Sequence, residues 1–139
     1  MELLKSPDYA YLLKASLQDL HRQNLERLSE TQLWREEINF FQKLLERYSS
    51  QISSSEQRKK ISHFQNLIIY YNGELLDQFT HDLKKHEKYL SRLLQDNESY
   101  SEESFRQTHI KLLDELKSFK KEFIEMKRNL FLFTESLME

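Results

Sequence analysis

Apolar side chains recur along the chain at alternating steps of three and four residues, in three separate stretches. The clearest members of the first stripe are Leu20, Trp34, Ile38, Phe41 and Leu45. Such a heptad pattern places one face of each helix against partner helices. The pattern therefore predicts three long helices, over about residues 7–51, 54–95 and 100–137.

Short polar segments separate these stretches and carry signals for helix starts. Ser6 and Pro7 fit the N-cap and the first position of the first helix. Capping boxes of the form Ser-x-x-Glu precede the other two helices, at Ser53–Glu56 and Ser99–Glu102. Because connections this short cannot return along a helix, consecutive helices must run antiparallel. The sequence predicts an all-α fold, a long, coiled-coil-like, up-down-up three-helix bundle that forms a single domain over residues 1–139.

Two irregularities interrupt the pattern. The polar run Ser29-Glu30-Thr31-Gln32 resembles a capping box, and a break near Ser29 would make a four-helix bundle instead. We favour a continuous helix, because neither Gly nor Pro occurs there and the heptad phase carries across. The second stripe takes two successive steps of four, at Tyr71, Leu75 and Phe79, with Gly73 between them. Such a stutter locally unwinds a coiled coil.

Composition excludes several classes of function. The 139 residues include one Gly, one Pro and no Cys or Val, which rules out Gly-rich phosphate loops and thiolate sites. A net charge of −2 gives no attraction to nucleic acid or to an anionic membrane. The longest apolar run, Leu67–Tyr71, is too short to span a bilayer, and residues 1–5 do not resemble a leader. No nucleophile arrangement with an oxyanion hole is recognisable. These features predict a non-enzymatic cytoplasmic protein that binds neither nucleic acid nor membrane.

Histidine is the residue type in this chain that is best suited to bind a metal ion or to titrate. The antiparallel register brings His21, His86 and His109 within about one helical turn of one another, with Asp82 four residues before His86. Imidazoles and a carboxylate that project from facing helices are what Zn and Fe sites in helical bundles use. The competing interpretation is a polar core layer that sets the helix register, and a third is a pH response near pH 6–7. We favour the polar layer and therefore predict no cofactor.

The half of the bundle near the first turn carries more apolar residues than one core stripe needs. The surplus positions are Phe40, Ile69, Tyr70 and Phe131. They predict an interaction surface for a protein partner, first of all a second copy in a homodimer. The alternative is a broad, aromatic-rich core in which they are half-buried.

Two segments, Leu33–Phe41 (LWREEINFF) and His63–Ile69 (HFQNLII), are followed by Asp82 and His86-Glu87. In these features the chain resembles a group of small coiled-coil proteins of Bacteroidetes. The resemblance implies a helical-bundle fold and a bacterial, cytoplasmic setting, and it carries no activity. We predict a helical-bundle protein that acts through protein–protein interaction or self-association. The alternative is a Zn- or Fe-binding bundle that uses the His/carboxylate cluster.

Overall fold

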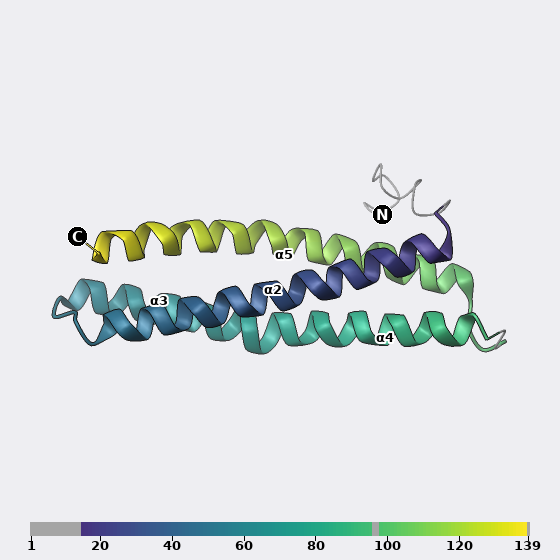
Figure 1. Ribbon diagram of the computed structural model, residues 1–139, viewed down its shortest axis with the longest axis horizontal. Coiled ribbons are helices and arrows are strands. Elements are labelled where there is room, and N and C mark those ends of the chain that lie inside the picture. The colour runs from purple at the N-terminus through teal and green to yellow at the C-terminus, as the bar shows by residue number, and fades with distance from the viewer. Residues whose placement is uncertain (1–14, 96–97, 139) are drawn as a thin grey trace. The chain divides into compact units, whose positions relative to one another are not determined.

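The computed structural model describes residues 15–95 and 98–138 (Figure 1). Those residues form helices and no strand: α2 (Leu17–Ser49), α3 (Ser55–Tyr70), the π-helical η2 (Tyr71–Leu76), α4 (Asp77–Leu93) and α5 (Glu102–Leu137). Three helical stretches pack against one another, which confirms the predicted all-α class. No helix among the described residues is long and apolar enough to cross a membrane.

The described residues divide into two compact units. Unit 1 holds the described residues up to Thr31 together with those of Phe79–Phe119, and unit 2 holds Gln32–Gln78 together with 120–138. Helix α2 runs through Ser29 without a break, so the predicted continuity is confirmed and the four-helix alternative is wrong.

The start of α2 differs from the prediction. Ala15 and Ser16 are not helical, and the Ser16 hydroxyl accepts a hydrogen bond from the Asp19 backbone N–H at 3.1 Å. Ser16 therefore caps the helix, and an uninterrupted helix over about residues 7–51 is wrong. The proposed cap at Ser6 and Pro7 lies outside the described residues.

The other two helices also begin later than predicted. Ser54, not Ser53, caps α3 by accepting from the Gln57 N–H at 3.4 Å. For α5 the Ser101 hydroxyl, not that of Ser99, accepts from the Ser104 N–H at 3.2 Å. Neighbouring serines are equivalent caps by sequence, and here a tertiary contact decides. The Ser101 N–H donates to the Tyr89 hydroxyl of α4 at 2.9 Å.

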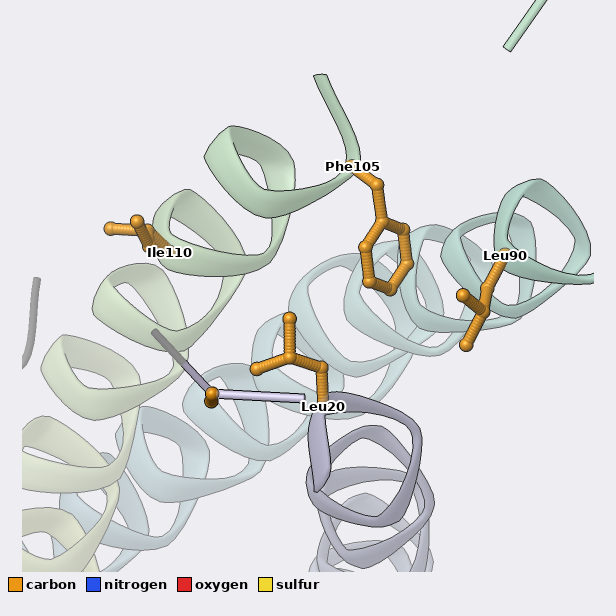
Figure 2. Packing of buried hydrophobic residues seen from close by; sticks show 5 residues of the cluster. Leu20, Leu90, Phe105 and Ile110 are labelled. Atoms are coloured by element: carbon orange, nitrogen blue, oxygen red, sulfur yellow. The ribbon is translucent and has the colours of Figure 1, made fainter. Parts of the chain in front are cut away.

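The core follows the predicted stripes closely. On α5 every described stripe position before Leu137 is buried: Phe105, His109, Leu112, Leu116, Phe119, Phe123, Met126, Leu130 and Phe133. Unit 1 contains an apolar cluster formed by Ala15, Leu20, Leu90, Phe105 and Ile110, of which Figure 2 shows the packing. The heptad spacing therefore identifies the buried face of each helix.

The predicted stutter coincides with the π-helical turn η2. Leu76 is fully buried there, and Leu75 is only partly buried, so the assignment of Leu75 to the core was wrong. A π-turn accommodates one extra residue per turn, which allows a five-residue step from Tyr71 to Leu76. The phase of the stripe then continues to Leu83, which is also buried.

Gly73 lies inside η2, and we expect Gly73→Ala to stabilise the protein by about 0.5–1 kcal/mol. A Cβ added at Gly73 meets no atom within 4 Å, so the methyl group introduces no clash. The gain comes from the lower backbone entropy of the unfolded chain. Urea denaturation followed by circular dichroism measures the change. A loss of stability would instead mean that the π-turn depends on the flexibility of glycine.

Candidate functional site

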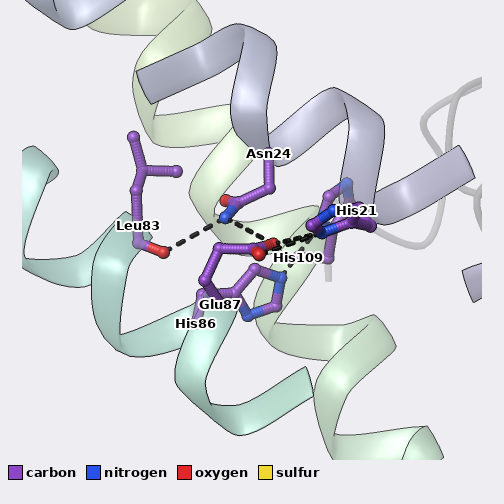
Figure 3. Close-up of polar contacts among 6 residues, drawn as sticks. All are labelled: His21, Asn24, Leu83, His86, Glu87 and His109. Carbon is purple, nitrogen blue, oxygen red and sulfur yellow. Dashed lines mark hydrogen bonds and ion pairs between the residues drawn. The ribbon is translucent and has the colours of Figure 1, made fainter. Parts of the chain in front are cut away.

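Unit 1 contains a layer of polar side chains inside its core. Asn24 on α2, His86 on α4 and His109 on α5 are each at most 3% exposed. Around them lie His21, Gln23 and Glu87, and we call these six residues the histidine layer (Figure 3, which draws all of them but Gln23). Buried polar groups persist in a core only where hydrogen bonds satisfy them.

The two buried imidazoles are linked directly. His86 Nε2 lies 2.9 Å from His109 Nδ1, and His109 Nε2 lies 3.0 Å from Gln23 Oε1. An amide oxygen only accepts, so His109 carries its proton on Nε2 and donates it to Gln23. His109 Nδ1 is then the acceptor for the His86 Nε2–H. Both rings are neutral in this arrangement, and the bonds run in one direction from His86 through His109 to Gln23.

The environment of the pair holds both rings in the neutral form. Burial, followed by the neighbouring His109, lowers the pKa of His86 to about 3. Burial, followed by Arg106 and Arg27, lowers the pKa of His109 to about 4. The Phe105 ring stacks on His86 with 4.2 Å between ring centroids and thus covers one face of the imidazole. The alternative of a titration near pH 6–7 therefore does not fit His86 and His109 in the folded protein.

Glu87 joins the exposed edge of the layer to its interior. Its carboxylate lies 2.9 Å from His21 Nδ1 and accepts a hydrogen bond from Asn24 Nδ2 at 3.0 Å. Asn24 Nδ2 also donates to the Leu83 carbonyl at 3.2 Å, and its Oδ1 is buried with no hydrogen-bond partner among the described residues. Glu87 was not among the predicted site residues, although it directly follows His86 in the sequence.

The structure brings together only part of the proposed metal set. His86 and His109 meet, His21 contacts Glu87, and Asp82 is half-buried one turn before His86 on α4. Within residues 15–95 and 98–138, no three His, Cys, Asp or Glu side chains converge in a way that could hold a metal ion. The Zn or Fe hypothesis therefore has no complete ligand set in the described part of the chain.

A different kind of surface occurs in unit 2. The four predicted surface residues Phe40, Ile69, Tyr70 and Phe131 are exposed by 59%, 63%, 46% and 55%. Sequence reasoning missed Leu33 and Ile124, which are exposed by 54% and 52%. The signal was available, because Leu33 and Phe40 on α2, and Ile124 and Phe131 on α5, are each spaced by seven residues and so share a helix face.

Contacts within unit 2 connect these two pairs of residues. The Phe41 ring packs edge-on against Phe40 at 5.8 Å and against Phe131 at 5.0 Å between centroids. Lys127 Nζ donates to Glu37 Oε2 at 2.7 Å, and both residues lie between the apolar positions of their helices. We call this surface the α2–α5 face; its members are Leu33, Glu37, Phe40, Ile124, Lys127 and Phe131.

An open cavity of about 290 Å³ also lies in unit 2, against α3, η2 and α5. Its lining includes Phe64, Tyr71, Glu122 and Glu125. Burial and the charge of Glu122 raise the pKa of Tyr71 above its usual value, so its hydroxyl stays protonated near neutral pH. The Tyr71 hydroxyl is therefore not activated as a nucleophile.

Comparisons with known proteins found no matching family model, no matching curated protein and no matching solved structure. The resemblance to small Bacteroidetes proteins stays a prediction.

Proposed function

We propose that this protein is a non-enzymatic helical-bundle module that associates with a second copy of itself through the α2–α5 face. The observation that carries the proposal is the apolar character of that face, where four large side chains stay about half exposed. The solvent side of a helix bundle is normally polar, and contiguous exposed apolar residues mark interaction sites.

The charges of the face favour a second copy as the occupant. Its two charged members are one acid, Glu37, and one base, Lys127, which form an ion pair. A surface that carries one charge of each sign is complementary to itself when a two-fold axis relates two copies. A strongly acidic or strongly basic partner would find no matching charge there.

The expected affinity is modest. Each apolar side chain is already about half-buried, so covering the remainder contributes about 1 kcal/mol. Eight such side chains in a dimer contribute about 8 kcal/mol, which must exceed an association cost of about 4–15 kcal/mol. At the low end of that cost the net gain is about 4 kcal/mol, so we expect a weak dimer with a dissociation constant of about 1 mM.

We also propose that the bundle is up-down-up and antiparallel, as the sequence predicts. Contacts within each unit support this topology. In unit 1 His21 contacts Glu87, whereas Asn24, further along α2, contacts the earlier residue Leu83. In unit 2 the Phe64 ring stacks on Phe133, whereas the later Tyr71 contacts the earlier Phe123. A cytoplasmic setting remains part of the same proposal.

The test is sedimentation of Phe40→Lys against the wild-type protein, from about 10 μM up to the expected dissociation constant of about 1 mM, at which half of the chains would be in dimers. We expect the wild-type mass to rise toward a dimer and the variant to stay monomeric, because a buried ammonium group opposes association. Ile69→Lys is the matched control, since Ile69 is equally exposed but lies on α3.

Circular dichroism of both variants verifies that the fold is intact. A wild-type protein that stays monomeric at about 1 mM would overturn the proposal, as would equal loss of association in the two variants.

A further inference from the structure

The two buried imidazoles of the histidine layer set unit 1 apart from unit 2. Of the five histidines in the chain, unit 2 contains only His63, which is exposed. Unit 1 contains His86 and His109, which are 3% and 2% exposed. Buried histidines that could take up a proton therefore occur in unit 1 and not in unit 2.

The hydrogen bonds of the pair are incompatible with two added protons. His109 Nδ1 is the acceptor for the His86 Nε2–H at 2.9 Å, and His109 Nε2 is already committed to Gln23. A first added proton therefore goes to His86 Nδ1 and puts a positive charge into the buried pair, and a second would put two N–H groups face to face and remove the hydrogen bond between the helices. Phe105, stacked on His86 at 4.2 Å between centroids, offers no acceptor.

The charged groups around the pair do not favour an imidazolium. From α2 come His21 and Arg27, and Arg27 pairs with Glu30 of its own helix at 3.1 Å. From α4 come Asp82 and Glu87, and the Glu87 carboxylate is engaged by His21 and Asn24. From α5 comes Arg106, which pairs with Glu102 and donates to the Ala15 carbonyl. The two arginines oppose a positive charge on His109.

We propose that the His86–His109 hydrogen bond is an acid-sensitive lock, so that mild acid opens unit 1 while unit 2 keeps its structure. The inference does not depend on self-association, because the layer and the α2–α5 face belong to different units.

Proton linkage gives the expected size of the effect. The folded unit holds both histidines neutral until the pH falls to about 4 and about 3, whereas the opened chain protonates them near pH 6.5. Between these limits the opened form binds two more protons than the folded form. The equilibrium constant for opening therefore rises by up to about 100-fold per pH unit as pH falls from about 6 to 5, and it is level above about pH 7.

Hydrogen exchange with mass spectrometry on the full chain, between pH 7 and 5 and corrected for intrinsic exchange rates, tests the proposal. We expect protection to fall for the amides of residues 83–93 and 105–116, with a proton dependence that approaches two. The amides of residues 38–48, 57–70 and 123–135 should keep their protection. Equal losses in the two sets, or no pH dependence in the first set, would overturn the proposal.

Variants assign the dependence to the pair. His86→Gln with His109→Gln should remove the pH dependence of opening, and either single change should halve the number of protons. His81→Gln, at an exposed position on α4, is the matched control and should keep the wild-type dependence.

A measurement on the wild-type protein covers the case in which the double variant does not fold. The NMR signals of the His86 and His109 ring Cε1–H groups should not titrate in the folded state above pH 5. Titration of either folded-state signal near pH 6.5 would refute the proposal.

Discussion

Replacing Phe123 with Ala should lower the free energy of unfolding by about 4 kcal/mol. Phe123 is fully buried in unit 2, and its ring lies 5.9 Å from that of Trp34 and 6.0 Å from that of Tyr71 between centroids. The Lys127 ammonium lies 5.0 Å from the centre of the same ring. Truncation removes all three contacts and leaves a cavity that stiff aromatic neighbours fill poorly.

Trp34 makes this prediction straightforward to measure. It is the only tryptophan of the chain and it contacts the substituted residue, so its fluorescence during urea unfolding reports on unit 2. Phe131→Ala, at an exposed position of the same helix, is the control, with an expected loss below about 1.5 kcal/mol. Equal losses in the two variants would mean that the core of unit 2 is not centred on Phe123.

The arrangement of the core could be predicted because heptad spacing is a direct consequence of helix geometry. Phe105 and Phe123 are joined by alternating steps of four and three residues, and Leu130 follows Phe123 by one heptad. All three residues are buried. No feature of the chain competes with that signal, since the one Gly and the one Pro are not placed to break α5.

The predictions that were wrong, the cap of α5 and the buried residue at the stutter, depend on features that the heptad pattern does not contain. Ser101 and Ser99 are equal candidates for a cap by sequence, and the Tyr89 hydroxyl decides between them by accepting from the Ser101 N–H. Similarly, steps of four from Tyr71 indicated Leu75, but a π-turn shifts burial to Leu76. Heptad counting assumes a constant turn, so it detects that the pattern is disturbed and misplaces the residue.

The sequence predicted where the histidine layer lies, but not which carboxylate contacts it or how far its pKa values are lowered. The expected register placed His86 near His109, and their ring nitrogens lie 2.9 Å apart. Which carboxylate approaches the layer depends on side-chain rotamers, and the contact is made by Glu87. The lowered pKa of each ring depends on how completely its neighbours exclude water, which periodicity alone does not contain.

Phe105→Ala should have a comparably large effect in unit 1, a loss of about 4 kcal/mol at pH 7. The side chain is 1% exposed, belongs to the apolar cluster with Leu20 and Leu90, and stacks on the His86 ring with 4° between the planes. Chemical unfolding followed by circular dichroism at 222 nm measures the loss. Phe105→Leu is the matched control, since it keeps most of the volume and should cost only about 1 kcal/mol.

The same variant should also weaken the response to acid, which separates it from an ordinary core truncation. In the wild-type protein each buried histidine lowers stability by about 2 kcal/mol between pH 7 and pH 5, because the unfolded chain takes up a proton that the folded chain refuses. Removing the Phe105 ring admits water to His86 and returns its pKa toward 6.5, so the contribution of that histidine shrinks. Unfolding curves at pH 7, 6 and 5 should therefore show a total pH-dependent loss of about 2 kcal/mol in Phe105→Ala and about 4 kcal/mol in the wild-type protein. An unchanged pH dependence in Phe105→Ala would show that groups other than the stacked ring keep water from His86.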